Sequence, residues 1–494
     1  MTPVSEQPAF AAPDLLDTTD AGGAAIRGGA LRIAGYIAGV AVSVLSSALL
    51  LRHLGVVAVG HYVTVLSLVA LAAQVTEAGL AAIGVRELST IPAARAQSFF
   101  QSLSGLRLVL ILVGVMGAFV FACLSGYSST LVLGTVVAGG GIVLVTVQIT
   151  YLLPLMARLQ LGWVTVVELV RQVGTTVVIV VLVLAGAPLL PFWAATIPAG
   201  AAAAVLSAFL IRRSMPLLPS FDRDVWRSLL RRTLPYSLAA AVGVIYFRLA
   251  ILIMSHVASG QQTGYYAASF RIIEVLFIVP QLVVGSTLPI FARAARDDRG
   301  RLDYALGRTF DVCLLLGLAV GLALVTGATF IVAVIAGTKF GPAAIVLRMQ
   351  GIALTFTFMG AMFAYALLSL GRYREVLLIN LTVLLLSGAF TGVLASRYGA
   401  LGAASATTVV EVLYTAMLAV AVVRAGARPQ ISLAAVPRVV LAAALGSLML
   451  LPVGLPSVAR PLLALAIYIA ALLVLRAVPH ELIEQLPRSR RGSH

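Results

Sequence analysis

LVLGTVVAGGGIVLVTVQITYLLP, residues 131–154, contains no Asp, Glu, Lys or Arg. The preceding apolar stretch, LRLVLILVGVMGAFVFACLS at residues 106–125, is separated from it by only five residues. About 20 mostly apolar residues, rising 1.5 Å per residue as an α-helix, are enough to cross the hydrocarbon core of a bilayer. The two stretches therefore predict two consecutive membrane-spanning helices joined by a short loop.

The same pattern extends over almost the whole chain. Of its 494 residues, 61% are hydrophobic and 11% are charged, whereas soluble domains are about 25% charged. No linker between the apolar blocks is long enough to hold a soluble domain. The fold class expected is an all-α polytopic membrane protein of about 14 spans, at 31–51, 62–83, 106–125, 131–154, 164–186, 192–211, 234–257, 265–290, 309–336, 344–370, 376–395, 399–423, 438–454 and 461–478.

Motifs for soluble-enzyme chemistry are missing from the sequence. Cys123 and Cys313 lie in apolar runs far apart, and the five histidines lack the spacing of a zinc-binding helix. No phosphate-binding GxxxxGK[ST] motif occurs. We therefore predict no catalytic residues, no metal and no cofactor.

The basic residues predict the orientation. The net charge of +16 could indicate nucleic acid in a soluble protein, but in a membrane protein an excess of arginine marks the cytoplasmic loops. An inside amino terminus places most arginines, including Arg107, on the inner side and no nucleic acid is implied. The predicted outer loops then hold only Arg52, Lys339, Arg397 and Arg460, so we expect both termini to be cytoplasmic.

A weak internal repeat predicts two lobes. GHYVTVLSLV at 60–69 resembles GYYAASFRII at 264–273, an offset of six predicted spans, which implies two six-helix halves in the same orientation. The polar stretch nearest the middle of the chain then connects them. The expected domains are a disordered cytoplasmic tail at 1–26, an N-lobe at 27–211, a cytoplasmic connection at 212–233, a C-lobe at 234–424, two further spans within 425–478 and a cytoplasmic tail at 479–494.

Arginines within spans are costly, so each is a candidate for function. Arg248 and Arg271 are expected at similar depths in neighbouring antiparallel spans, where they could share one chamber. Arginine suits a phosphate because its planar guanidinium stays charged when desolvated and can bind two oxygens. We predict that Arg248 and Arg271 bind an anionic lipid phosphate, with Arg348 as a secondary candidate. The alternatives are a structural brace between helices and, for Arg348, a surface position one turn inside its span.

Three acids within spans have two open interpretations each. Glu274 follows Arg271 by three residues and could form a salt bridge with it. Glu77 could exchange a proton if unpaired, or pair with an arginine of another helix. Glu411 has no partner identifiable in sequence. Glu77, Glu274 and Glu411 are therefore candidates either for ion coupling or for charge pairing.

Several strings, in this order and spacing, resemble the polysaccharide-export flippases, the O-antigen and exopolysaccharide branch of the multidrug/oligosaccharidyl-lipid/polysaccharide exporter superfamily. The resemblance covers almost the whole chain. Its pieces are TEAGLAAIGVREL at 76–88, YFRLAILIM at 246–254, GYYAASFRIIEVLFIVP at 264–280, LPIFAR at 288–293, FGPAAIVLRMQGIAL at 340–354 and RYGALGAASATTVVE at 397–411.

The resemblance implies two helical bundles around a central cavity that opens alternately to the two sides of the bacterial cytoplasmic (inner) membrane. The implied cargo is a polyprenyl-(pyro)phosphate-linked oligosaccharide, moved outward for cell-surface polysaccharide assembly. Membrane lipid and a polysaccharide polymerase or ligase are the implied partners. Arg248 and Arg271 match basic cavity positions of the family, but many relatives resemble FRID where this chain has Ala250 in place of the acid.

Three other functions stay open at this stage. A peptidoglycan-precursor lipid flippase would use the same pyrophosphate chemistry. A multidrug exporter of the same superfamily would need acids and aromatic residues for cationic cargo. A polyprenyl-phosphate-dependent membrane glycosyltransferase would need an acid on an outer loop, and the predicted outer loops carry none.

Overall fold

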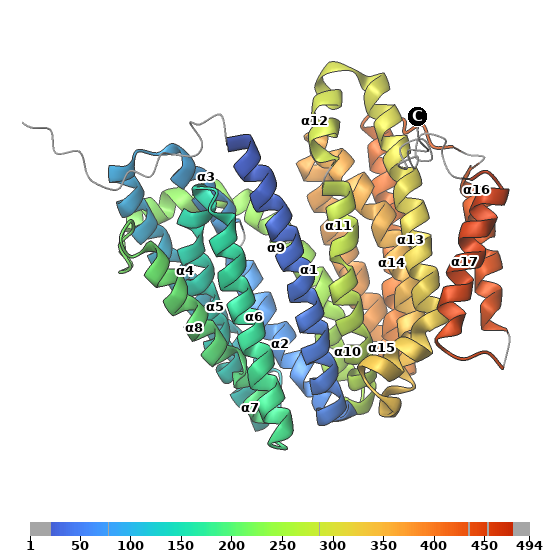
Figure 1. Ribbon diagram of the computed structural model, residues 1–494, viewed down its shortest axis with the longest axis horizontal. Helices are drawn as coiled ribbons and strands as arrows, with labels where there is room; N and C mark the ends of the chain where they lie inside the picture. The colour runs from blue at the N-terminus through green and yellow to red at the C-terminus, as the bar shows by residue number, and fades with distance from the viewer. Residues whose placement is uncertain (1–20, 78, 286, 433–434, 452–453, 478–494) are drawn as a thin grey trace, which may run out of the picture. The chain divides into compact units, whose positions relative to one another are not determined.

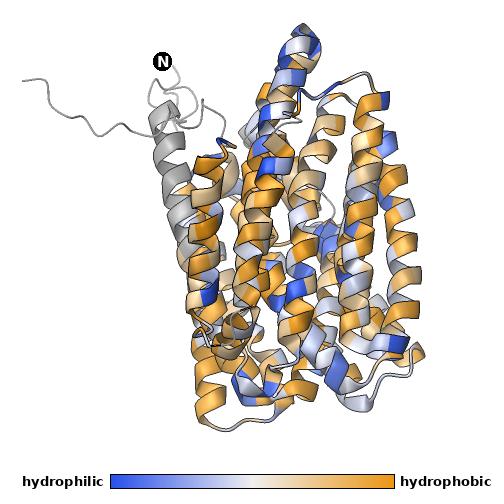
Figure 2. Ribbon diagram, turned by 90° about the vertical axis from the view of Figure 1, so that its right-hand side faces the viewer, coloured by the Kyte–Doolittle hydropathy of each residue, from blue (hydrophilic) through white to orange (hydrophobic). Residues whose placement is uncertain are grey.

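The computed structural model describes residues 21–77, 79–285, 287–432, 435–451 and 454–477. Within these ranges all regular structure is helical, which confirms the all-α fold class. Nine helical segments of the described chain are long and apolar enough to cross a membrane. Figure 2 shows apolar residues along most of their length and hydrophilic residues mainly toward their ends.

The expected count of about 14 spans agrees with these helices. One of the nine segments, α15 (Tyr373–Arg424), is 52 residues long and is interrupted at Gly399, whose φ of 59° and ψ of −136° are not helical. It therefore supplies two of the expected spans. Four shorter apolar helices fall on the expected first, seventh, thirteenth and fourteenth spans, at Ala38–Leu54, Ala241–Val257, Ala435–Leu450 and Ala459–Val474.

Large apolar side chains on the helix surfaces face outward. Leu124, Leu184 and Val474 are 83%, 81% and 81% exposed, respectively. Soluble proteins rarely expose extensive apolar surface, whereas lipid tails accept it without cost. These faces are therefore the ones expected to contact lipid.

The chain forms two compact units. The first comprises Met1–Leu50 and Val65–Ala241, and the second comprises Leu51–Thr64 and Val242–His494. Three helices, α1 (Ala21–Leu54), α2 (Val56–Glu77) and α9 (Arg223–Val257), are divided between the two units.

The first unit is built around α5, which packs against α4 and α8 (Figure 1). Its buried core includes Phe100, Leu152, Val167 and Ile211. Two hydrogen bonds join the polar residues after α8 to α4. The Ser220 amide donates to the Gln101 carbonyl, and the Trp226 ring nitrogen donates to the Ser102 carbonyl. Its other helices are α3 (Leu80–Thr90), α4 (Ala93–Leu124), α5 (Ser129–Ala157), α6 (Leu161–Leu184), α7 (Leu189–Ala194) and α8 (Thr196–Ile211).

The second unit has α14 (Ala343–Ser369) at its centre, between α13 (Arg299–Ile335), α15 and α10 (Gly260–Leu276). Close approach of α13 and α14 depends on Gly321, where an added Cβ would collide with Thr355. The hairpin of α16 and α17 packs on α13 (Figure 1). The remaining elements are α11 (Ile278–Gly285), α12 (Leu288–Asp297), α16 (Ala435–Ser447), α17 (Ala459–Val474) and the 3-10 turns η2 (Thr338–Phe340) and η3 (Leu448–Leu450).

Residues 51–64 belong to the second unit although they come from the first two spans. Arg52 donates hydrogen bonds to the carbonyls of Ala333 (3.3 Å) and Val334 at the end of α13. Gly60 touches α10 so closely that an added Cβ would lie 2.9 Å from the Gly264 amide nitrogen. The two copies of the internal repeat therefore meet at their first glycines.

Candidate functional site

Two partly buried arginines of the second unit share one carboxylate. Glu274 on α10 accepts a 2.6 Å hydrogen bond from Arg248 Nη2 of α9 through Oε1. It accepts another 2.6 Å bond from Arg271 Nη1 through Oε2. The side chains of Arg248, Arg271 and Glu274 are 12%, 33% and 21% exposed. These three residues are called the arginine cluster below.

The local sequence explains how the cluster forms. Ser259 caps α10 by accepting a 3.3 Å hydrogen bond from the Gln262 amide. Arg271 and Glu274 then lie three residues apart on one face of α10, so the expected salt bridge between them is present. Arg248 is positioned from α9, where the neighbouring Phe247 ring packs 5.0 Å from the Phe270 ring centroid.

The charges of the arginine cluster do not balance. Within the cluster, two guanidinium groups and one carboxylate sum to a formal charge of +1. Tyr62, from residues 51–64, lies within electrostatic range of Arg271 and Glu274. An anionic group entering here would exchange one carboxylate–arginine hydrogen bond for its own, and it would neutralise the remaining charge.

Arg348 has a different environment. It lies near the start of α14, and its hydrogen bond runs from Nη2 to Thr329 Oγ1 of α13 at 3.4 Å. Its Nε is buried without a hydrogen-bond partner in the described part of the chain. No ion pair recorded between described residues joins Arg348 to the arginine cluster, so the structure brings together only two of the three predicted arginines.

Glu411 is buried beside a small cavity of the second unit. Its Oε1 accepts a 2.5 Å hydrogen bond from Tyr246, and its Oε2 accepts a 3.0 Å bond from Thr357. Both recorded partners are neutral hydroxyl groups. The cavity measures about 50 Å³ and is also lined by Gln350 and Ser387. A buried water needs roughly 10–15 Å³, so this space can hold a few small polar species.

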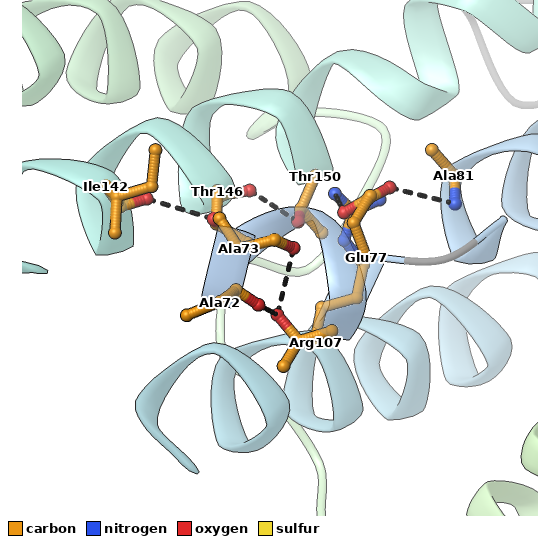
Figure 3. A network of polar contacts seen from close by, with 9 residues as sticks. Ala72, Ala73, Glu77, Ala81, Arg107, Ile142, Thr146 and Thr150 are labelled. Carbon is orange, nitrogen blue, oxygen red and sulfur yellow. Dashed lines mark hydrogen bonds and ion pairs between the residues drawn. The ribbon is translucent and has the colours of Figure 1, made fainter. Parts of the chain in front are cut away.

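Glu77 is paired with an arginine that the sequence analysis misplaced. Arg107 was expected near an inner loop, but it lies within α4 with only 1% of its side chain exposed. Its Nη2 donates to Glu77 Oε2 at 2.5 Å, while the Ala81 amide donates to Oε1 at 3.2 Å (Figure 3). Glu77 thus has an arginine of another helix as its partner, as in one of its two interpretations.

This pair lies at a break in the second span. The helix α2 ends at Glu77, and α3 begins at Leu80 after Gly79, whose φ is 86°. Glycine adopts this left-handed conformation without steric cost. The Glu77 carboxylate therefore links three elements, because it ends α2, caps α3 and pairs with α4. Arg107 Nε and Nη1 are buried without a hydrogen-bond partner among the described residues.

Arg107 could have been found from the sequence by a longer hydropathy window. The helix α4 starts at Ala93, thirteen residues before Leu106, where the predicted span begins. Tyr246 and Thr357 could not be recognised from the sequence as partners of Glu411, because a single hydroxyl residue in an apolar span forms no repeating pattern. Among the described residues, no group of three or more His, Cys, Asp or Glu side chains could hold a metal ion.

Comparison with known proteins shows the fold. No protein-family model matches the sequence, and no curated protein matches it either. Among solved structures, the chain is similar to the lipid II flippase MurJ in an inward closed conformation. The TM-score is 0.76 at 13% identity, and the match covers 92% of this chain and 99% of MurJ.

Two further transporter structures are also similar. An inward-facing multidrug resistance MATE family transporter of the MOP superfamily has a TM-score of 0.63 at 15% identity, covering 77% of this chain and 94% of its own. A MOP superfamily transporter from Pyrococcus furiosus, described as having a binding pocket of reverse polarity, has a TM-score of 0.53 at 17% identity, covering 82% and 96%. The chain therefore has the fold of the transporters and flippases of this superfamily.

Proposed function

We propose that this protein is a flippase that moves a polyprenyl-(pyro)phosphate-linked oligosaccharide from the cytoplasmic to the outer leaflet of the bacterial inner membrane. The observation that carries the proposal is the net positive charge of the arginine cluster, held at low exposure in the fold of a lipid flippase. An excess of positive charge at partly buried positions favours an anionic cargo.

The cluster would hold the cargo by its phosphate. A phosphate oxygen replaces Glu274 on one arginine, and Glu274 stays with the other, so no guanidinium is left without an anionic partner at any stage. Such an exchange lets the cargo bind and leave without exposing an uncompensated buried charge, which would cost several kcal/mol. The sugars follow the phosphate, and the prenyl tail remains in lipid while the cluster is exposed to one side and then the other.

Among the three candidate acids, Glu411 is the best suited to ion coupling. Glu77 and Glu274 each pair with arginine, whereas the hydroxyl partners of Glu411 leave its charge without a counter-ion in those contacts. Either a proton or a small cation in the adjacent cavity would supply the missing charge. We therefore assign ion coupling to Glu411 and structural pairing to Glu77.

A peptidoglycan-precursor flippase is the second candidate function, and the similarity to MurJ favours it. Lipid-linked peptidoglycan precursor and lipid-linked oligosaccharide present the same phosphate chemistry to the arginine cluster. They differ in the group beyond the phosphate, so cargo identity has to be measured.

Cargo selection is tested with the wild-type protein in proteoliposomes, using three fluorescent cargoes in parallel. We expect translocation of a polyprenyl-pyrophosphate oligosaccharide, slower movement of the peptidoglycan precursor and no movement of a cationic dye. Preference for the precursor would support the second candidate. Export of the dye alone would contradict both flippase proposals, and sugar transfer to an acceptor would indicate the glycosyltransferase alternative.

A further inference from the structure

A second polar pocket lies at one end of the first unit. It has a volume of about 230 Å³ and lies among the ends of α3, α4 and α5 and the residues that follow α8. Its polar lining includes Ser89, Gln97, Arg158 and Ser214, and its apolar lining includes Ile91 and Met215. We call this the α5-end pocket. Neither the arginine cluster nor Glu411 contributes to it.

Arg158 gives the α5-end pocket a positive charge. The helix α5 ends in a tight reversal, in which Leu159 has a φ of 56° and the Gln160 amide bonds back to the Leu155 carbonyl at 2.9 Å. This reversal fixes the backbone that carries Arg158, whose side chain is exposed. No hydrogen bond or ion pair is recorded for the Arg158 side chain in the described part of the chain, and the pocket lining includes no carboxylate.

The walls of the pocket are held in place by separate contacts. Gln97 Nε2 donates to the Ser214 carbonyl at 3.4 Å and joins α4 to the segment after α8. Ser89 Oγ donates to the Val85 carbonyl at 2.7 Å, so the hydroxyl can only accept from a ligand. Met215, only 6% exposed, belongs to the apolar core beneath. The pocket thus combines a cationic, polar rim with an apolar floor.

The pocket lies at the ends of candidate spans, the level at which lipid headgroups are expected. It is formed where four candidate spans end, and the next helix, α6, begins at Leu161. Trp163, on the first turn of α6, is 50% exposed. Exposed tryptophan is enriched at the membrane–water interface, where its ring lies at headgroup level. Arg95, Arg212 and Arg213 on the adjoining segments add positive charge to this end of the unit.

We infer that the α5-end pocket binds the phosphate headgroup of an anionic phospholipid of the inner leaflet. Arg158 pairs with the phosphate, the polar rim binds the glycerol hydroxyls, and the apolar floor contacts the start of the acyl chains. Basic pockets between helices on the cytoplasmic side are suited to such headgroups. This inference is independent of the transported cargo, because it depends only on the location of the pocket in the membrane.

The test compares the full-length wild type with Arg158→Gln, in detergent, by native mass spectrometry of bound lipid. Phosphatidylglycerol and phosphatidylcholine are titrated separately. We expect the wild type to prefer phosphatidylglycerol and Arg158→Gln to bind it roughly fivefold more weakly, the loss expected for one arginine at an anionic headgroup. Arg374→Gln, at another exposed arginine, should retain the preference.

Two further arms make the outcome decisive. Ser89→Trp should block the pocket from the opposite wall and reduce phosphatidylglycerol binding as much as Arg158→Gln does. Inorganic phosphate should not displace the lipid. The inference is overturned if the two lipids bind the wild type equally, if Arg158→Gln keeps the preference, or if inorganic phosphate competes and so indicates a free-phosphate site.

Discussion

At the scale of single residues, Glu274 is shared by two arginines, Arg271 of its own helix and Arg248 of α9. Arg271 and Glu274 are three residues apart, so helix geometry alone predicts their salt bridge. Arg248 reaches Glu274 from another helix, and only its similar depth could be predicted from the sequence. Arg107 was misplaced because its span starts earlier than the apolar run, and charged residues at a helix end cannot be distinguished by hydropathy from loop residues.

Removing Glu77 should destabilise the protein more than removing its partner. Glu77→Ala leaves the Arg107 guanidinium buried without a counter-ion, which costs about 3–5 kcal/mol. Arg107→Met leaves a carboxylate that is 32% exposed and still caps α3. We therefore expect a lower apparent melting temperature for Glu77→Ala than for Arg107→Met, measured in detergent. In the double variant the two losses should not add, and full additivity would contradict the pairing.

Glu411→Gln should separate ion coupling from cargo binding. A glutamine amide replaces one carboxylate oxygen with an NH2 group, so the hydroxyl of Tyr246 or of Thr357 must turn from donor to acceptor, at a cost of about 1–2 kcal/mol. We expect cargo exchange without an ion gradient to continue and gradient-driven accumulation to stop. Tyr246→Phe, which keeps the acid, should retain both activities. Accumulation by Glu411→Gln at the wild-type rate would rule out the coupling role.

At the scale of helices, hydropathy predicts where spans lie but not where they break. The expected spans at 376–395 and 399–423 correspond to the two halves of α15, since Gly399 lies at their junction. The break at Gly79 was missed because the second span stays apolar on both sides of it. Similarly, the docking of residues 51–64 on the second unit depends on glycine contacts that leave no periodic pattern.

The contact between the repeat glycines can be tested by adding one methyl group. Gly264→Ala would drive Cβ into the Val56 carbonyl, and overpacking of this kind costs about 1–3 kcal/mol. We expect faster hydrogen exchange in residues 51–64 than in the wild type. Gly243→Ala, where an added Cβ meets no atom within 4 Å, should leave that exchange unchanged. Equal exchange in both variants would mean that the contact does not hold the segment.

At the scale of the whole molecule, composition and span count were sufficient for the fold class, and the comparison with MurJ supports them. Orientation was predicted from the arginine distribution and remains a prediction. The division of the chain into its two compact units could not be predicted from the sequence, because packing between helices sets the boundary of each unit. The assignment of residues 51–64 to the second unit is a result of such packing.

Orientation is testable by thiol labelling in a variant without Cys123 and Cys313. With both termini inside, Ser125→Cys lies at an outer loop and Ser89→Cys at an inner one. A membrane-impermeant reagent should label Ser125→Cys in intact cells and Ser89→Cys only after permeabilisation. The reverse pattern would invert the orientation and place the α5-end pocket in the outer leaflet.

The most direct test of the central claim is the initial rate of polyprenyl-pyrophosphate oligosaccharide translocation in proteoliposomes at matched protein content. Loss of one charge-assisted hydrogen bond to the phosphate, about 1.5–3 kcal/mol, predicts a rate roughly 10- to 150-fold lower for Arg248→Ala and for Arg271→Ala. Arg372→Ala, which removes an exposed arginine paired with Glu375 in the same i,i+3 geometry, should match the wild type. If Arg248→Ala and Arg271→Ala also translocate at the wild-type rate, the arginine cluster does not bind the cargo phosphate.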